Sequence, residues 1–453
     1  MQRNEVEVAV VGAGAAGLAA ALELKRAGFE VLLVEACDRP GGVMQTEEIH
    51  GHRVERGPNT CLVKAPALAF LRDHSLEKEL VPASPARRLR FVFHGGSLVP
   101  VPLGPVAFVR SPLLTTRGKL RLLGEPLVRR GDAKGESAAE FVARRFGREA
   151  TEALLAPALT GIYAGDEHEL GADAVLGFAT ALERSHGSVA RGLLSRALRP
   201  RVRGLAGTFS ARDGLGGLAA RFAGALGDRL LLRSRVAALG LEGNGLRLEF
   251  AGSSSPLLRA RSVVVALPAA EAAALLRSVA PGAAEVAAKV SYAPVVSISV
   301  SVRPEEVRAP IEGFGFLVPR ASGLKLLGCL FMSRLFPDRA PPGRALLTCL
   351  LGGARWPEAM NEPDDLLVSQ LGKELDATLG LRGGFDLLAL SRWPRAVAQP
   401  GRHHGTLMAE LHRETARVRG LSLAGGWLDG VSIADTLSSG VRAASALRAG
   451  LVS

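Results

Sequence analysis

Apolar runs separated by glycines and charged residues predict the order of strands and helices along the chain. Residues 8–11 and 31–34 are short apolar runs, and the stretch between them is apolar at helical spacing until Gly28. This pattern predicts a strand, a helix and a second strand. Leu, Ala and Arg recur at helical spacing in residues 116–128 and 137–145. Further strand-like runs lie at residues 235–239, 246–250, 263–268, 295–302, 314–318 and 345–351.

The turn after the first strand has the spacing of a dinucleotide-binding site. Glycines at positions 12, 14 and 17 form a Gly-x-Gly-x-x-Gly turn, and Glu35 closes the second apolar run. The first glycine permits the tight turn, the second lets a pyrophosphate approach backbone N–H groups, and the third allows helix and strand to pack closely. The acid can accept hydrogen bonds from a ribose. The predicted cofactor contacts here are Gly12, Ala13, Gly14, Ala15, Ala16, Gly17, Glu35 and Ala36.

Length and charge narrow the class of protein. At 453 residues and 47% hydrophobic content, the chain should form two or three domains. The formal net charge is +12, but the arginines are dispersed and only two tyrosines are available for base stacking, so we expect no nucleic-acid partner. A basic face toward anionic lipid or an anionic substrate is the better hypothesis, against an evenly solvated surface as the alternative.

The cysteines and the apolar runs indicate the compartment. Cys37, Cys61, Cys329 and Cys349 show no C-x-x-C spacing, which favours reduced thiols in the cytoplasm. The apolar stretch after Arg3 belongs to the nucleotide turn rather than to a signal peptide. No run of eighteen apolar residues occurs. We therefore expect a cytoplasmic protein that lies on the inner face of the cell membrane without crossing it.

The residues after Glu35 favour FAD. Arg39, Gly41 and Gly42, followed by residues 55–59, resemble the opening of the flavin-dependent amine oxidase and desaturase superfamily. A glycine pair at 425–426 precedes a predicted helix at about 435–448, whose N-terminus would stabilise the negative charge of reduced flavin. Superfamily members with covalent flavin usually attach it through a cysteine near the C-terminus, but the last cysteine of this sequence is Cys349. The resemblance therefore implies non-covalent FAD. Further cofactor contacts would be Arg39, Gly42, Val43, Gly57, Pro58, Asn59, Thr60, Val236, Trp393, Val431, Ser432 and Ile433.

Several internal segments resemble the protoporphyrinogen oxidase family within that superfamily. They are residues 55–60, 90–96, 160–165, 313–319 and 350–353, and they extend over essentially the whole chain. The resemblance implies oxidation of protoporphyrinogen IX to protoporphyrin IX in haem biosynthesis, with oxygen as acceptor and hydrogen peroxide as by-product. The alternative is oxidation of coproporphyrinogen III to coproporphyrin III. Further alternatives are an amine oxidase and a carotenoid-type desaturase.

The same resemblance assigns substrate contacts. Arg90 would bind a propionate, since an arginine fork is the natural partner of a carboxylate. Gly161 matches a glycine whose carbonyl faces the macrocycle. Four positions match residues that sandwich the tetrapyrrole, although apolar strand residues usually belong to a core: Phe314, Leu317, Leu330 and Leu350. No Ser-His-Asp order and no metal-spaced cluster is seen, so we expect flavin N5 to carry the chemistry without a catalytic side chain or a metal.

The chain departs from the family pattern in two places. The family usually reads Trp-Pro-x-x-x-Pro-Gln-Tyr around Trp393, whereas Ala398 and Pro400 flank Gln399 here. After Gly430, the usual Asn-Asp-Cys is Ala-Asp-Thr at residues 434–436. Both changes are expected near the isoalloxazine face, where they would alter flavin tuning.

The expected fold is α/β, with a Rossmann-like FAD-binding domain, a mixed-sheet substrate domain and a helical membrane-associated insertion. We assign residues 1–62, 208–272 and 395–453 to the FAD-binding domain, 63–87 and 273–394 to the substrate domain, and 88–207 to the insertion. The expected partners are a porphyrinogen, molecular oxygen and a membrane surface. A homodimer is a possible assembly.

Overall fold

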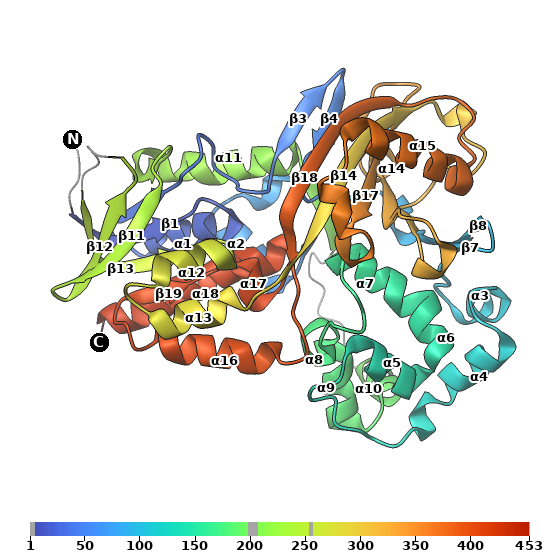
Figure 1. Cartoon of the computed structure of the whole chain (residues 1–453), viewed down its shortest axis with the longest axis horizontal. Helices are drawn as coiled ribbons and strands as arrows, with labels where there is room; N and C mark the ends of the chain where they lie inside the picture. The colour runs from blue at the N-terminus through green and yellow to red at the C-terminus, as the bar shows by residue number, and fades with distance from the viewer. Residues whose placement is uncertain (1–4, 198–206, 253–256, 453) are drawn as a thin grey trace.

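The computed structural model describes residues 5–197, 207–252 and 257–452. One half of the molecule is built on a sheet around β1 (Glu5–Val11), which pairs in parallel with β2 (Val31–Val34) and β13 (Leu258–Val265). Strand β19 (Leu421–Leu423) pairs in parallel with β13, so segments from both ends of the chain meet in one sheet (Figure 1). The other strands of this sheet are β10 (Leu230–Leu231), β11 (Val236–Glu242) and β12 (Gly245–Phe250).

Helices cover both faces of this first sheet. On one face, α1 (Ala15–Arg26) lies so close to α18 (Ile433–Val452) that a Cβ on Gly440 would overlap the Ala16 carbonyl oxygen. Helix α11 (Gly214–Leu226) lies on the same side. The opposite face is covered by α12 (Ala269–Leu276), α13 (Pro281–Ala288) and α16 (His404–Thr415). The parallel strands β1 and β2 and the second half of β13 are therefore buried on both sides, as their continuous apolar runs require.

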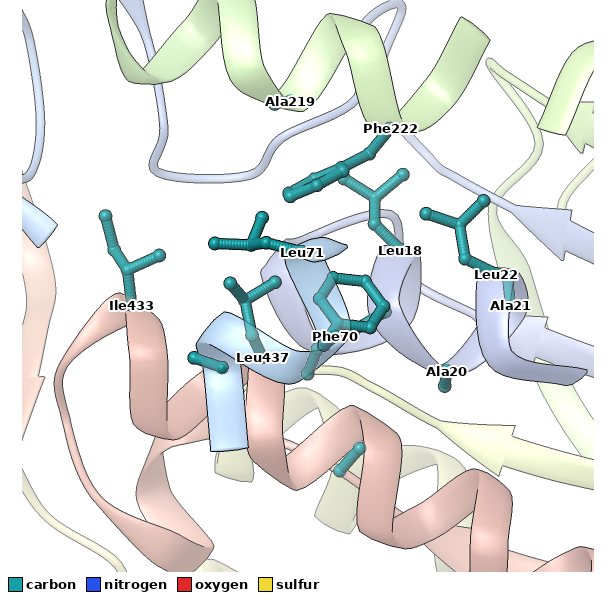
Figure 2. Packing of buried hydrophobic residues seen from close by; sticks show 14 of the residues in the cluster. Leu18, Ala20, Ala21, Leu22, Phe70, Leu71, Ala219, Phe222, Ile433 and Leu437 are labelled. Carbon is teal, nitrogen blue, oxygen red and sulfur yellow. The ribbon is translucent and has the colours of Figure 1, made fainter. Parts of the chain in front are cut away.

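Helix α2 (Ala65–Asp73) belongs to this first core. Figure 2 shows Phe70 and Leu71 among Leu18, Phe222 and Leu437, which come from the helices of the first layer. We had assigned residues 63–87 to the substrate domain. The structure differs because the apolar side of α2 meets the apolar sides of α1 and α18.

The second sheet has the strand order β18-β14-β17-β16-β15-β7-β8. Its longest strands are β14 (Tyr292–Val302) and β18 (Asp386–Ala398), which pair antiparallel. Helix α15 (Asp364–Leu379) packs on one face through its leucines. The remaining strands are β7 (Phe91–His94), β8 (Ser97–Pro100), β15 (Gly315–Leu317), β16 (Gly328–Phe331) and β17 (Ala345–Gly352).

The helical part begins later than we expected. Strands β7 and β8 form a hairpin in the second sheet, where Phe91 pairs with Phe316, so residues 91–100 are not helical. Buried Val92 and Val99 face each other in this hairpin, which explains why the segment prefers a sheet. Residues 198–206 of the expected insertion lie outside the described residues.

The helices between residues 105 and 197 lie beside the second sheet (Figure 1). They are α3 (Pro105–Arg110), α4 (Thr116–Leu123), α5 (Ala138–Phe146), α6 (Arg148–Ala150), α7 (Ala156–Tyr163), α8 (Ala172–Val175), α9 (Gly177–His186) and α10 (Val189–Ala197). Arg145, at 0% exposure, joins them through Glu125 (Nε–Oε1 2.7 Å) and Glu183 (Nη1–Oε1 3.2 Å). Breaking a buried ion pair costs about 3–5 kcal/mol, so this network holds the helices together.

Within the described ranges, no helix has the length and apolar character needed to span a membrane. Shorter elements complete the fold. They are β3 (Thr46–Ile49), β4 (His52–Glu55), β5 (Cys61–Val63), β6 (Leu80–Pro82), β9 (Gly207–Ala211), α14 (Met332–Leu335) and α17 (Gly426–Asp429).

Candidate active site

The glycine turn joins the end of β1 to the start of α1. Gly12 has a φ of +101°, and a Cβ there would lie 2.7 Å from the Ala266 carbonyl oxygen. A Cβ on Gly17 would overlap the Gly12 carbonyl oxygen. At Gly14, by contrast, no atom of the described residues lies within 4 Å of the position of a Cβ, apart from those of Gly14 and its two neighbours in the chain. The turn therefore leaves space before the N-terminus of α1, which favours an anion.

A second glycine pair lies beside this turn. The Gly41 N–H donates to the Ala13 carbonyl oxygen at 2.8 Å, and a Cβ on Gly42 would lie 3.3 Å from the Cα of Gly14. The Arg39 guanidinium donates to the Gly42 carbonyl oxygen at 2.9 Å. The structure thus brings the residues predicted to contact the phosphates together, with Ala15 and Ala16 in the first turn of α1.

Glu35 lies at the end of β2, where backbone groups fix its carboxylate. Its Oε2 accepts from the Ala13 N–H at 2.7 Å and its Oε1 from the Cys37 N–H at 2.8 Å. The Ser234 N–H donates to the Glu35 carbonyl oxygen at 2.7 Å, so the start of β11 with Val236 lies on the same side. Exposed Ala36 completes the group predicted to contact the nucleoside.

A third group comes from three separate segments. A Cβ on Gly57 would overlap the Val43 carbonyl oxygen and lie 3.6 Å from Cζ2 of Trp393. The Trp393 Nε1–H donates to the Arg56 carbonyl oxygen at 2.9 Å. Pro58 and Thr60 are half-buried on the same loop as Asn59.

Asn59 supplies a test of whether this region suits a flavin. The side chain is 8% exposed, and its Nδ2 donates to the Gly57 carbonyl oxygen at 3.4 Å. Its Oδ1 is buried and has no hydrogen-bond partner within the described part of the chain. An unpaired buried acceptor costs about 1–3 kcal/mol, which a bound donor would recover. The isoalloxazine ring carries such an N–H group, so the residues fit a flavin.

The N-terminus of α18 closes this region. Ser432 precedes the helix, accepts from the Asp435 N–H at 3.1 Å and donates to Oδ2 of Asp435 at 2.6 Å. Lys64 Nζ lies 2.9 Å from the other carboxylate oxygen of Asp435. Val431 is half-buried beside Ser432, whereas Ile433 belongs to the first core. Ala434, one of the departures from the family pattern, is 1% exposed and packs in the same core.

The predicted substrate residues share one face of the second sheet. Gly328 on β16 pairs with Leu317 on β15 and with Leu350 on β17. Leu330, two residues after Gly328, therefore points to the same face as both leucines. All three leucines are half-buried, whereas the opposite face packs under α15. We call Leu317, Leu330 and Leu350 the leucine wall.

Gly161 and Arg90 lie at this wall. A Cβ on Gly161 would lie 2.6 Å from Cδ2 of Leu317, so the end of α7 approaches the wall closely because residue 161 lacks a side chain. The Arg90 guanidinium lies 4.8 Å from the centre of the Phe314 ring. Arg90 is exposed, and the structure shows no carboxylate paired with it among the described residues. The site thus combines an apolar wall, a close backbone approach and a free cation at the edge.

Comparison with known proteins assigns the family. Residues 15–448 match the model of the flavin containing amine oxidoreductases. The chain belongs to this family. It is an oxidoreductase, and its cofactor is FAD, because a family flavin and a dinucleotide site occur in one chain.

Individual relatives extend this flavin amine oxidoreductase assignment. Protoporphyrinogen oxidase 1 of Arabidopsis thaliana is 32% identical over 94% of this chain and 84% of its own length. Coproporphyrinogen III oxidase of Bacillus subtilis (strain 168) is 28% identical over 98% of each chain. A solved structure from Exiguobacterium sp. 255-15, provisionally named a protoporphyrinogen oxidase, has a TM-score of 0.83 at 24% identity and covers 99% of each chain. This last likeness shows the fold.

Sequence reasoning gave no role in this flavoenzyme to Tyr163 or Gln399. The Gln399 Nε2 donates to the Tyr163 carbonyl oxygen at 2.8 Å, which joins the end of β18 to the end of α7. Burial, together with the negative charge of Asp435, raises the pKa of the Tyr163 phenol. The departure from the family pattern around Gln399 was the only signal in the sequence that marked this position.

One cluster outside the predicted site has ligand atoms of the kind that bind metals. The ligand atoms of Asp166, Glu167 and His168 lie within 4.8 Å of one another. Asp166 already pairs with Arg320 at 3.2 Å, and His168 is exposed. We assign no metal to this cluster.

Proposed function

We propose that this oxidoreductase oxidises a porphyrinogen in haem biosynthesis, converting protoporphyrinogen IX to protoporphyrin IX. The observation that carries the proposal is the leucine wall with Arg90 stacked on Phe314 at its edge. A flat macrocycle with carboxylates at its rim needs both an apolar surface and a cation. The name of the Arabidopsis relative supports the same substrate class.

Each part of the site has a defined task in this reaction. Bound FAD supplies a hydride acceptor at its N5 position. The leucine wall excludes water and presents a flat surface, and Gly161 lets the backbone approach the ring. Arg90 holds a propionate and so fixes the rotation of the ring. Removal of six hydrogens takes three two-electron rounds, in which three molecules of oxygen become three of hydrogen peroxide.

An absorbance experiment tests this function. Protoporphyrinogen added to the purified protein without oxygen should bleach the flavin absorbance, and admitting oxygen should restore it with release of peroxide. Acid precipitation should leave all FAD in the supernatant, since we propose non-covalent binding. A flavin spectrum unchanged by either porphyrinogen would contradict the proposal.

Coproporphyrinogen III is the second candidate substrate. The Bacillus subtilis relative named for this substrate aligns over nearly the whole of both chains. The choice between the two substrates depends on whether carboxylates can be accommodated at the leucine wall.

We also propose that α3, α4 and the segment after them lie on the cytoplasmic face of the cell membrane. Between Leu103 and Leu127, six large apolar side chains are exposed, and their exposed fractions range from 64% to 87%. Exposed arginines at 110, 117, 129 and 130 lie in the same stretch. Apolar side chains among cations favour the headgroup region of anionic lipid.

Flotation with liposomes tests the membrane proposal. The protein should float with vesicles that contain anionic phosphatidylglycerol, and less so at high salt. Leu127→Ser should reduce flotation, whereas Leu241→Ser, which removes an exposed leucine from β11 in the other half, should not. Equal recovery of the two variants with vesicles would exclude the assigned surface.

A further inference from the structure

The last turn of α7 is held by groups from outside the helix. The final carbonyls of a helix lack partners within it. The Tyr163 carbonyl accepts from Nε2 of Gln399 at 2.8 Å, and the Ala164 carbonyl accepts from the Ala354 N–H at 2.8 Å. Ala354 lies two residues after Gly352, the last residue of β17, and Gln399 directly follows β18. Two strands of the second sheet therefore fix the turn that carries Gly161.

Gln399 is itself fixed on several sides. Its N–H donates to the Ser291 carbonyl oxygen at 2.9 Å, and its Nε2 also donates to the Val397 carbonyl oxygen at 2.9 Å. Its Oε1 lies where a Cβ on Gly165 would be, so glycine at 165 leaves room for the amide. The chain then continues along the helical part, where the Gly171 N–H donates to the Pro400 carbonyl oxygen at 2.9 Å.

This anchor sets the distance between Gly161 and the leucine wall. A Cβ on Gly161 would lie 2.6 Å from Leu317, so the turn and the wall are in close contact. No hydrogen bond of the described residues uses the Gly161 carbonyl, and its position depends on the turn that Gln399 holds. A small movement of this turn changes the space in which the reacting ring lies.

We propose that Gln399 is a positioning residue, which holds the end of α7 against the leucine wall and so sets the orientation of the bound substrate for hydride transfer. The inference rests on the proposed function. In this role Gln399 acts through the Tyr163 carbonyl oxygen. Misplacement of reacting groups by about 1 Å costs about 100-fold in rate. Because Arg90 still anchors a propionate, loss of Gln399 should lower kcat far more than it raises KM.

A double-mutant cycle between Gln399 and Gly165 provides the test. Gln399→Ala removes the donor to Tyr163, and Gly165→Ala places a methyl group where the Gln399 amide lies. Each single change should lower kcat by about 10- to 100-fold, with KM within about threefold. In the double variant the methyl group no longer meets the amide and is close only to Cδ1 of Leu170, at 3.1 Å, the end of a flexible side chain. The kcat of the double variant should therefore be within about twofold of that of Gln399→Ala and well above the product of the two single losses. If the two substitutions acted independently, their fold-losses in kcat would multiply in the double variant, and that result would overturn the inference.

Two further variants separate positioning from general loosening. Gln399→Glu keeps the size but replaces the donor with an acceptor facing the Tyr163 carbonyl, so its kcat should fall at least as far as that of Gln399→Ala. Arg320→Ala removes the exposed pair with Asp166, two residues beyond Ala164, and should change kcat less than twofold. FAD content should stay at the wild-type ratio in every variant.

The outcomes distinguish this inference from the function on which it rests. A wild-type protein that oxidises neither porphyrinogen would refute the function, and the inference with it. An active wild type with unchanged kcat in Gln399→Ala, or with a higher KM alone, would refute only the positioning role. Should Gln399→Ala fail to fold, Gly165→Ala and Gln399→Glu still report whether displacing the amide lowers kcat.

Discussion

The Arg90 guanidinium lies over the Phe314 ring, 4.8 Å from its centre, and no carboxylate of the described residues pairs with this exposed cation. The Phe314 N–H donates to the carbonyl oxygen of Leu89, the residue before Arg90, at 2.8 Å. This bond fixes the backbone of Arg90 relative to that of Phe314. A contact with the face of an aromatic ring needs no N–H···O bond, so the guanidinium keeps N–H donors for a ligand. A planar acid such as a propionate can bind those donors at little cost in side-chain order.

Arg90→Ala should lower kcat/KM for the porphyrinogen by about 10- to 100-fold, because a hydrogen bond to a charged group contributes about 1.5–3 kcal/mol. The loss should be mainly in KM, with FAD content unchanged. Arg88→Ala provides the control, since Arg88 is exposed two residues earlier. Steady-state peroxide release measures both variants, and equal kinetics would remove Arg90 from the substrate site.

Protoporphyrinogen should have a higher kcat/KM than coproporphyrinogen. Residues 314–318, 327–331 and 347–351, which include the leucine wall, contain no Lys or Arg. We therefore expect this surface to accept vinyl groups but not the two additional propionates of coproporphyrinogen. Burying an unpaired carboxylate costs several kcal/mol. Peroxide release measured side by side decides the question. A higher kcat/KM for coproporphyrinogen would assign the protein to the coproporphyrin branch of haem synthesis.

Gly14→Ala should leave the fold intact but weaken FAD binding by at least about tenfold, or about 1.4 kcal/mol. The new methyl group meets no atom of the described residues and projects into the space before α1, where the pyrophosphate would lie. Gly224→Ala on α11 is the control, because it also meets nothing within 4 Å but lies away from the turn. Titration of the apoprotein with FAD measures affinity. Wild-type affinity in Gly14→Ala would place the pyrophosphate elsewhere.

Stability should fall as the pH drops below about 6.5, partly because of His52. This side chain is 4% exposed, and burial lowers the pKa of its imidazole. Below the ordinary histidine pKa, the unfolded chain therefore binds more protons than the folded protein, and the free energy of unfolding decreases. Between pH 7.5 and 5.5, His52→Asn should lose about 1–3 °C less in Tm than the wild type. Exposed His94→Asn should behave like the wild type, and an identical pH profile for His52→Asn would refute the assignment.

The sequence predicted the parts of the site that depend on local conformation. Gly12, Gly14 and Gly17 form a turn whose conformation depends on residues close together in the sequence. The structure shows the expected close approaches at Gly12 and Gly17. Alternation along β15 to β17 likewise fixes which face Leu317 and Leu350 share, once the strands pair. The glycine turn follows from spacing alone, whereas the leucines were assigned through the family resemblance and their shared face depends on strand pairing.

Contacts between distant segments were beyond sequence reasoning. The assignment of α2 to the substrate domain was wrong because its apolar side suits any apolar partner, and only the tertiary fold selects α1 and α18. The hydrogen bond from Gln399 to Tyr163 joins residues 236 positions apart. No periodicity or motif spacing encodes such a pair, since a glutamine amide can find many carbonyl partners.

The meeting of both chain ends in the first sheet sets the order of events during synthesis. Helix α1 leaves the ribosome long before α18, which packs on it and begins only at Ile433. At about 5–20 residues per second, this partner follows α1 by roughly 20–80 s. For that time the apolar side of α1 lacks its final cover, which makes the nascent chain a client for chaperones. The site for FAD is complete only after α18 has been synthesised, so capture of the flavin follows synthesis of every segment from β1 to α18 and is not the nucleus of folding.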